Sequence, residues 1–369
     1  MTNEIGKAGW PVSSPEDAGF DQLSLERAVQ FAIANESKMD RDIGAALREG
    51  HFEEPWPIGQ TIGPVKSREG PNGVILRGGR IVTTWGDVDR VDMTFSISKS
   101  YLALCAGIAV DDGLIPDIND PVRLLVDDGG FESEQNRDIT WAQLLQLTSE
   151  WEGTLWDKPD WIDHNRNVIG DGNGAEKGVQ RTMRPPGSHW EYNDVRVNRL
   201  ALALLRVFKQ PLPEVLKHRI MDPIGASDTW EWHGYDNSWI DVDGKRMQSV
   251  SGGAHWGGGL WINTLDHARV GQLMMNNGTW NGNRILSEDW VKACRNPCGM
   301  NNQYGYLWWL NTDAAMFPGA SATSFFGLGV GTNLIWVDPA LDLVAVVRWI
   351  EKDAVSEFMG LVMKALYSD

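Results

Sequence analysis

The pattern of apolar and polar positions predicts a chain that mixes helices and strands. The strongest apolar periodicity runs from Thr94 to Val110, where apolar residues recur at steps of three and four, as in a buried helix. Ahead of it, Gly73 to Trp85 forms two β-branched runs around a Gly-Gly pair, which predicts a β-hairpin. Further helices are predicted over 23–34, 140–147, 195–208, 264–275 and 354–366, and further strands over 304–310, 333–337 and 343–350. Two strands followed by a buried helix indicate that the chain begins as an α+β fold.

The pattern changes in the middle of the chain. From Gly113 to Ile224 strand-like runs are few and several segments have helical spacing, whereas strand character returns after Pro223. Within this region, 151–178 is rich in Trp, Asp, Asn and Gly, which predicts a long ordered loop with a flexible tip at 171–174. Long loops in compact proteins often form the walls of sites.

Composition narrows the function classes. The formal net charge is −17 with no basic run, so nucleic acid and anionic membranes are not expected as partners. No signal-peptide-like or membrane-length apolar stretch occurs, and we expect a soluble, cytoplasmic protein. Three cysteines, Cys105, Cys294 and Cys298, imply neither a disulfide framework nor a zinc site. The Gly-x-Gly-x-Gly run at 327–331 precedes a strand, which argues against a dinucleotide site, so we expect no cofactor and no metal.

The first turn of the central helix carries candidate chemistry. Ser96 and Lys99 are three residues apart, so their side chains share one face of the helix. A serine hydroxyl becomes a nucleophile when a neighbouring base takes its proton, and burial disfavours the ammonium form of a lysine. Free backbone N–H groups at a helix start can also hold an anion. The alternative is a helix cap beside a solvated lysine.

Two other stretches contain candidate site residues. Tyr192 and Asp194 lie just before or at the start of the helix over 195–208, and His255 and Trp256 lie among five glycines at 252–259. Alternatively, Tyr192 is simply a half-buried aromatic residue, and His255 is a histidine that forms structural hydrogen bonds. A Ser-His-Asp triad of the α/β-hydrolase type is not indicated, because no serine stands in Gly-x-Ser-x-Gly.

Three motifs together resemble a known family. Ser96-Ile97-Ser98-Lys99, Tyr192-Asn193-Asp194 and Gly327-Leu328-Gly329 occur in the order and at the approximate distances of the motifs of class C β-lactamases and their serine-hydrolase relatives. These relatives include D,D-peptidases, family VIII carboxylesterases and 6-aminohexanoate-dimer hydrolases. The resemblance extends from about Ser14 to the C-terminal helix, including the stretch 257–271.

The resemblance implies a fold and a domain organisation. The fold is α+β with three layers, α/β/α, in which N- and C-terminal helices pack on an antiparallel sheet. The implied α/β domain comprises 1–112 and 225–369, and 113–224 is a mainly helical inserted domain. The active site is expected at the junction of the two, a usual place for a pocket.

The resemblance also implies roles. Ser96 would be the acylated nucleophile, Lys99 its proton partner, and Tyr192 the general base that later protonates the leaving group. Gly329 and Val330 would flank the pocket on an edge strand, with the N–H groups of Ser96 and Val330 forming an oxyanion hole. Beyond the motifs, five tryptophans are expected near the pocket as amphipathic walls: Trp156, Trp161, Trp256, Trp308 and Trp309.

Two departures from the family pattern affect the expected substrate. Asp194 stands where the second motif has asparagine, and Gly327 stands where the third motif has a cation. Without that cation the site lacks the expected partner for a substrate carboxylate, which favours neutral or differently charged esters and amides over penicillins and peptidoglycan stems. We therefore expect a serine hydrolase for a small-molecule ester or amide, in a chain that could form a homo-oligomer. The alternatives are β-lactamase or D,D-peptidase-type activity, and a binding or sensing relative without turnover.

The orientation of Asp194 decides between two schemes. If its carboxylate reaches Lys99, it favours the ammonium form of that lysine, and the base role falls to Tyr192. If it turns away, it either pairs with Arg196 or caps the helix that begins beside it.

Overall fold

A six-stranded antiparallel sheet forms the centre of the protein. The computed structural model describes residues 9–52, 54–168 and 176–367. The strands follow the order β11-β12-β13-β14-β1-β2 across the sheet. They are β1 (Asn72–Arg77), β2 (Arg80–Trp85), β11 (Trp309–Leu310), β12 (Phe325–Gly329), β13 (Asn333–Asp338) and β14 (Leu343–Arg348). Every residue of β13 and β14 is buried, because the sheet is covered on both faces.

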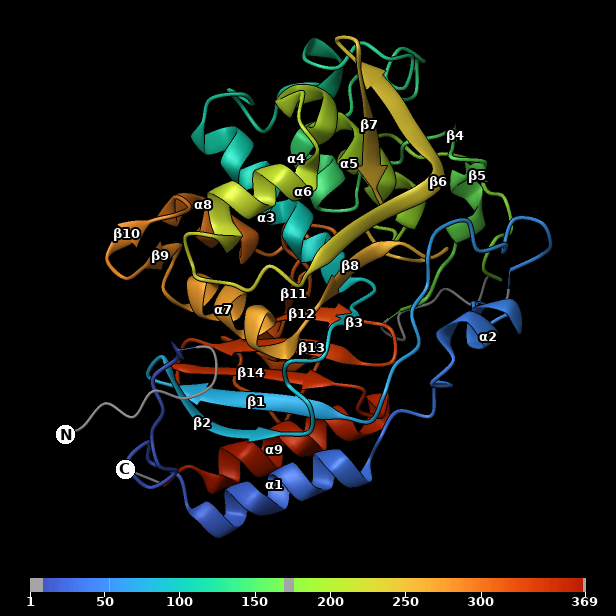
Figure 1. Ribbon diagram of the computed structural model, residues 1–369. Helices are drawn as coiled ribbons and strands as arrows, with labels where there is room; N and C mark the ends of the chain where they lie inside the picture. Colours follow the sequence, from blue (N-terminus) through green and yellow to red (C-terminus); the bar gives the residue numbers. More distant parts are fainter. Residues whose placement is uncertain (1–8, 53, 169–175, 368–369) are drawn as a thin grey trace.

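Helices form the two outer layers. On one face, α1 (Gln22–Ala34) and α9 (Val355–Ala365) pack on each other below the sheet in Figure 1. Phe358 of α9 lies 6.1 Å from Trp85 of β2, measured between ring centroids. On the other face, α7 (Thr264–Met275) packs against β14, β13 and β1. The predicted α+β fold, with terminal helices packed on an antiparallel sheet, is confirmed.

A mainly helical region lies above the sheet in Figure 1. Its longest elements are α3 (Ile97–Asp111) and α5 (Asp194–Phe208), and it also contains α4 (Trp141–Leu145), α6 (Leu212–Leu216), β4 (Thr154–Leu155) and β5 (Lys158–Pro159). Helix α3 packs against α5 and α6 on one side and against β12 and β13 on the other. It is buried over most of its length, so its N-terminal turn lies between the sheet and the helical region.

A second sheet extends upward from this junction. It has the order β3-β8-β6-β7 and consists of β3 (Asp92–Met93), β6 (Glu231–Val242), β7 (Lys245–Val250) and β8 (Gly259–Ile262). Smaller elements at the periphery are α2 (Ile43–Arg48), α8 (Glu288–Cys294), β9 (Thr279–Trp280) and β10 (Asn283–Arg284). Because β3 leads directly into α3, this sheet fixes the start of that helix.

Most predicted elements are confirmed, with three differences. The central helix begins at Ile97 and not at Thr94, because Phe95 adopts a left-handed φ of 48° that a helix cannot contain. The strand expected over 304–310 is limited to Trp309–Leu310, since Leu307 also takes a positive φ, of 55°. The loop over 151–178 contains the β4–β5 hairpin and a 3₁₀ turn, Asp160–Asp163, and its expected flexible tip at 171–174 lies outside the described residues.

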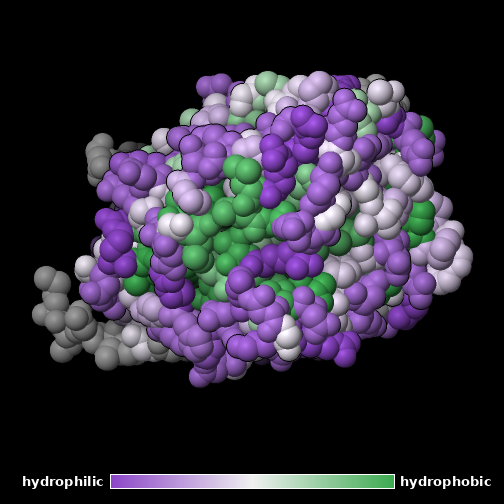
Figure 2. Space-filling model, turned by 90° about the horizontal axis from the view of Figure 1, so that it is seen from above, coloured by the Kyte–Doolittle hydropathy of each residue, from purple (hydrophilic) through white to green (hydrophobic). Residues whose placement is uncertain are grey.

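The surface is hydrophilic over much of the face seen from above, with a hydrophobic area near its centre and smaller ones around it (Figure 2). Among the described residues, no helix has the length and apolar character needed to cross a membrane. The three cysteines are buried and unpaired.

Candidate active site

Ser96 lies at the N-terminus of α3 and lines a cavity. The cavity has a volume of about 710 Å³, and Ser96 lines it together with Tyr192, Trp309, Gly329 and Val330. Ser96 itself is half-buried, so its hydroxyl is held by the protein and still accessible from the cavity. This cavity lies where the N-terminal turn of α3 meets the end of β12.

The other two serines of this turn have structural roles. Ser98 is buried, and its Oγ accepts a hydrogen bond from the N–H of Leu260 at 2.9 Å. Ser100 is also buried, and its Oγ donates to the carbonyl of Leu307 at 2.9 Å. Both hydroxyls serve to attach α3 to neighbouring segments, which leaves Ser96 as the serine of this turn that faces the cavity.

Lys99 joins the first two sequence motifs. Its side chain is only 1% exposed, and its Nζ lies 2.9 Å from Oγ of Ser96 and 2.6 Å from Oδ1 of Asp194. The same Nζ lies 4.6 Å from the ring centroid of Tyr192. The structure thus brings Ser96, Lys99, Tyr192 and Asp194 together.

An aromatic cluster holds Tyr192 in place. Its ring stacks on Trp309 with centroids 5.6 Å apart and an interplanar angle of 20°. Tyr304 and Trp190 contact it at centroid distances of 6.3 Å each. Tyr192 is therefore a buried aromatic residue and a cavity residue at once, and Trp309 lines the cavity as expected.

The end of β12 approaches the start of α3. A Cβ on Gly329 would overlap the carbonyl oxygen of Thr94 and lie 3.4 Å from the Ser96 nitrogen, so only glycine permits this approach. In the described part of the chain, the N–H groups of Ser96 and Val330 donate to no backbone carbonyl. Two free N–H groups beside a half-buried hydroxyl are the arrangement that stabilises an oxyanion.

Gly327 lies differently from its neighbours. A Cβ on it would meet Ile97 at 3.3 Å and Oγ of Ser100 at 3.4 Å, so this position faces α3. Leu328, the next residue, lines the cavity. The prediction that Gly327 belongs to the pocket is wrong, because successive residues of a strand face opposite sides and Gly327 faces the helix.

Asp194 is directed at the site and not at its own helix. The carboxylate contacts Lys99, Arg166 and His255, while Asn193 caps α5 by accepting from the N–H of Arg196. The Arg196 guanidinium instead binds Glu150 at 3.0 Å. Burial alone would raise the pKa of the Asp194 carboxyl, but Lys99 and Arg166 outweigh burial and hold this pKa well below its usual range.

Arg166 is a site residue that the sequence did not single out. It comes from the loop over 151–178, lines the Ser96 cavity, and lies 5.1 Å from the Tyr192 ring centroid. Its Nη1 contacts Asp194 and lies 3.2 Å from Oδ1 of Asp163. Burial would lower the pKa of this guanidinium, but the two carboxylates outweigh burial and raise it. The sequence feature that could have indicated Arg166 is the loop itself, which we expect to form a wall of the site.

Glu54 and His255 extend the site away from the cavity. Nδ1 of His255 lies 3.2 Å from Oδ2 of Asp194, and Nε2 lies 2.5 Å from Oε1 of Glu54. The Trp256 indole donates to Oε2 of Glu54 at 2.7 Å. Burial would raise the pKa of Glu54, but His255 and Lys177 hold it at about 2. Nothing in the sequence pattern indicated Glu54, which lies in an irregular segment.

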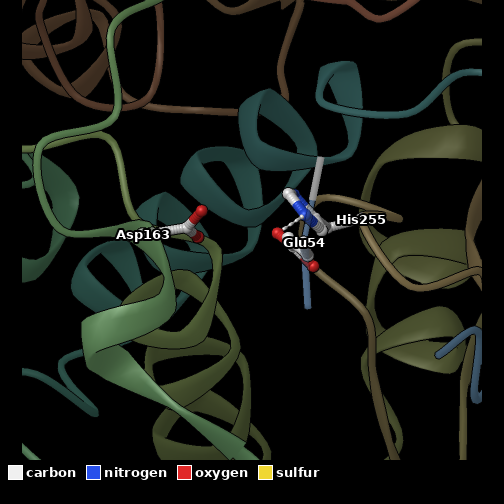
Figure 3. A group of neighbouring side chains, drawn as sticks. All are labelled: Glu54, Asp163 and His255. Atoms are coloured by element: carbon white, nitrogen blue, oxygen red, sulfur yellow. Dashed lines mark hydrogen bonds and ion pairs between the residues drawn. The ribbon is translucent and has the colours of Figure 1, made fainter. Parts of the chain in front are cut away.

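The same residues include a group with metal-ligand chemistry. Ligand-type atoms of Glu54, Asp163 and His255 lie within 4.8 Å of one another (Figure 3). However, Nζ of Lys177 lies 2.6 Å from Glu54 and 3.6 Å from Asp163, and Arg166 also binds Asp163. Two cations already balance these carboxylates and would repel a metal ion, so the group is a charge-paired network.

The other four tryptophans expected near the pocket from the sequence do not line the Ser96 cavity. Trp156 and Trp161 line a different cavity of about 750 Å³, next to Asp128 and Arg199. Trp308 is fully buried and packs edge-on against Phe325. The expectation that these three residues line the Ser96 pocket is wrong. Aromatic composition gives no information on which cavity a side chain enters. Trp256 is buried beside His255, behind the site.

Comparison with known proteins identifies the family. The Beta-lactamase family model matches residues 68–349, which is most of the chain, and the chain therefore belongs to this family. The expected resemblance is confirmed at this level.

Individual relatives are distant. Protein Rv1367c of Mycobacterium tuberculosis is 25% identical over 196 residues, which cover 44% of this chain and 49% of the relative, so the match spans about half of that protein. The 6-aminohexanoate-dimer hydrolase of Paenarthrobacter ureafaciens is 22% identical over 296 residues, which cover 74% of this chain and 70% of the relative. Among solved structures, a family VIII carboxylesterase has a TM-score of 0.59 at 17% identity, over 94% of this chain and 99% of that chain. At this identity the superposition shows a shared fold.

Proposed function

We propose that the protein is a serine hydrolase that cleaves an ester or an amide through an acyl-enzyme on Ser96. The observation that carries the proposal is the 2.9 Å contact between Nζ of Lys99 and Oγ of Ser96 at the wall of the cavity. A nucleophile and a base within hydrogen-bond reach, with a third group orienting the base, is the general signature of covalent catalysis. The hydrolase and carboxylesterase among the similar proteins support the same reaction class.

The geometry suggests a role for each group. Oγ of Ser96 adds to the carbonyl carbon while its proton passes to Nζ of the neutral Lys99 amine. Asp194 reaches Lys99 and by itself favours the ammonium form, so this role of Lys99 requires a compensating positive charge next to Asp194. The N–H groups of Ser96 and Val330 hold the oxyanion of the tetrahedral intermediate. When the intermediate collapses, the bond to the leaving group breaks, the leaving group takes a proton through Tyr192, and the acyl group stays on Ser96. Water then adds to the acyl carbonyl, and the acid leaves as Ser96 recovers its proton.

The cavity walls favour an apolar substrate portion without a carboxylate near the reacting bond. Val168, Met316, Phe317 and Leu328 line the cavity together with Trp309. Arg166 lines the cavity beside Tyr192 and is already paired with Asp163 and Asp194. A substrate carboxylate could pair with Arg166 only by displacing one of these buried partners, which would leave a buried charge uncompensated.

Covalent labelling tests this proposal directly. The protein is incubated with a fluorophosphonate and with short- and medium-chain p-nitrophenyl esters, and intact and peptide masses are recorded. We expect one added phosphonyl group on the peptide that contains Ser96, and ester turnover that the probe inhibits. Ser96→Ala should lose both while its circular dichroism spectrum and Tm remain those of the wild type.

Two results would contradict the proposal. Activity retained in Ser96→Ala would identify a different nucleophile. Absence of labelling and of turnover in the folded wild type would favour a binding relative that keeps the cavity without chemistry.

A further inference from the structure

His255 lies between two carboxylates, and each of its ring nitrogens faces one of them. Nδ1 lies 3.2 Å from Oδ2 of Asp194, and Nε2 lies 2.5 Å from Oε1 of Glu54. The ring is 1% exposed and stacks on Phe52 with centroids 4.0 Å apart, so it has no room to rotate away. In Figure 3 a dashed line joins the ring to Glu54, and Asp163 stands apart from the pair at the left of the view.

These contacts fix the number of protons in the group. A neutral imidazole carries one N–H, so its other nitrogen would present a lone pair to a carboxylate oxygen. Two carboxylates can both be satisfied only if the ring carries two N–H groups or if one carboxyl is protonated. Glu54 also binds Lys177, and Asp194 also binds Lys99 and Arg166; these cations favour the ionised form of both carboxyls, so neither holds the additional proton at neutral pH.

Two other buried histidines provide an internal contrast. Nε2 of His164 faces Oδ2 of Asp160 at 3.0 Å, but its Nδ1 accepts from the N–H of Arg181 at 3.4 Å. His267 lies between the hydroxyls of Thr94 and Tyr101, at 2.8 and 2.9 Å. A neutral ring satisfies both of these surroundings, because each offers a donor for the unprotonated nitrogen. Of these three histidines, His255 alone has an acceptor on each side.

We infer that His255 is an imidazolium at neutral pH, held by Glu54 and Asp194, and that it acts as a positioning residue whose charge frees Lys99 to serve as the base. This inference rests on the proposed function for its catalytic consequence. The protonation state of His255 itself follows from the contacts.

The charges around His255 explain how its protonation affects Lys99. The carboxylates that face the network are Glu54, Asp163 and Asp194, and the cations are Lys99, Arg166 and Lys177. With a neutral ring, three carboxylates are balanced only if Lys99 is an ammonium. With an imidazolium, the balance is complete when Lys99 is the neutral amine that can accept the Ser96 proton.

Two further titratable groups lie close to this network. Burial and the neighbouring His255 lower the pKa of His51, which therefore adds no charge at neutral pH. Lys158 donates to the carbonyl oxygen of Gln60 at 2.7 Å, and burial lowers its pKa to about 8. Its ammonium lies 5.0 Å from the Trp256 ring centroid and is directed at backbone carbonyls. The balance at Lys99 is therefore set by Asp194, Arg166 and His255.

Nuclear magnetic resonance of the histidine rings tests the charge state without any substrate. The protein is labelled with ¹⁵N-histidine, and the signals of His255, His164 and His267 are assigned by comparison with single His→Gln variants. Between pH 6 and 8 we expect two protonated nitrogens on His255 and one on each of the other two rings. A bare ring nitrogen on His255 at pH 7 would overturn the inference, even if the protein proves to be a Ser96-dependent hydrolase.

Glu54→Gln is the matched variant. Its amide can donate to Nε2 and still accept from the Trp256 indole, whereas Lys177 loses its Oε1 partner and keeps Asp163 at 3.6 Å; the reason for the second proton on His255 is removed. We expect His255 to become singly protonated, with unchanged signals for His164 and His267. A doubly protonated His255 in this variant would show that Glu54 does not hold the proton.

The pH dependence of kcat/KM tests the catalytic consequence. In His255→Gln the charge beside Asp194 is lost, the ammonium form of Lys99 is favoured, and the ascending limb should move to higher pH by about one unit. His164→Gln removes a buried histidine of similar exposure and should leave the limb unchanged. An unmoved limb in His255→Gln, with a fall in Tm, would mean that the residue only supports the fold.

Discussion

A Cβ atom on Gly253 would overlap Oδ1 of Asp194. The same atom would also collide with Nζ of Lys99, so the absence of a side chain at this position leaves the space in which the buried ion pair forms. Gly253 has no positive φ that would require glycine, so the requirement is steric. It comes from the glycine-rich stretch before β8, for which the sequence predicts close backbone approach.

Gly253→Ala should therefore disrupt the Lys99–Asp194 pair. We expect kcat/KM to fall on the order of a hundredfold, which is the usual contribution of one positioned proton transfer. Gly299→Ala is the matched control, because a Cβ there meets nothing within 4 Å. Ester hydrolysis and thermal unfolding of both variants provide the measurement, and wild-type activity in Gly253→Ala would show that the pair is dispensable.

Lys99 and Tyr192 should act in one step. Lys99→Ala and Tyr192→Phe are each expected to reduce the acylation rate on the order of a hundredfold, and the double variant should lose little more than the worse single one. Tyr304→Phe is the control, since it removes a phenolic hydroxyl from the same aromatic cluster, with ring centroids 6.3 Å from Tyr192. Pre-steady-state burst kinetics measure acylation, and additive losses would place the two residues in separate steps.

Asp194→Asn should change the pH profile and not only stability. The pKa of this carboxyl lies well below its usual range, so the residue is an anion at any working pH. Its removal favours the neutral amine of Lys99, and the ascending limb of kcat/KM should move to lower pH. A constant profile combined with a lower Tm would instead assign Asp194 to fold support.

Esters should be better substrates than carboxylated β-lactams. Gly327 faces α3 and supplies no cation, and Arg166 is already bound by two carboxylates. We expect kcat/KM for a medium-chain p-nitrophenyl ester to exceed that for a chromogenic cephalosporin by a wide margin. Efficient cephalosporin hydrolysis that is lost in Arg166→Gln would show that Arg166 replaces the third-motif cation.

Acid should weaken the fold through Glu150. Burial would raise the pKa of this carboxyl, but Arg181 and Arg196 hold it at about 2, below its usual value near 4.5. A depressed pKa means that the unfolded state binds the proton first, so the stabilisation is complete above pH 4.5 and is lost as pH falls toward 2. The difference corresponds to roughly 3 kcal/mol in the free energy of unfolding.

Urea titrations across this pH range measure the effect. Glu150→Gln should be less stable than the wild type at pH 7 and should lose less stability between pH 4.5 and 2. Glu357→Gln, on the exposed face of α9, should follow the wild-type curve. If Glu150→Gln and the wild type lose stability in parallel as the pH falls, other carboxylates control the acid transition.

Local pattern accounts for much of what the sequence determined. The β1–β2 hairpin, α1, α7 and α9 match their predicted ranges closely, because apolar periodicity and turn residues act over a few neighbouring positions. Ser96 and Lys99 were found in the same way, since a spacing of three places both on one face of a helix. Tyr192 and Asp194 stand at a helix start, but the resemblance to the family's second motif is what marks them as site residues.

Tertiary packing decided the rest of the site. Asp194 meets Lys99 across 95 residues of sequence, and His255 meets Glu54 across 201. Neither Glu54 nor Arg166 lies in a periodic segment, and nothing local indicates which carboxylate or cation an irregular loop will deliver to a helix terminus. The tryptophans give the same result, since Trp156 and Trp309 are alike in composition but line different cavities. Burial forces charges to find partners wherever packing brings them, and only the folded chain determines which partners those are.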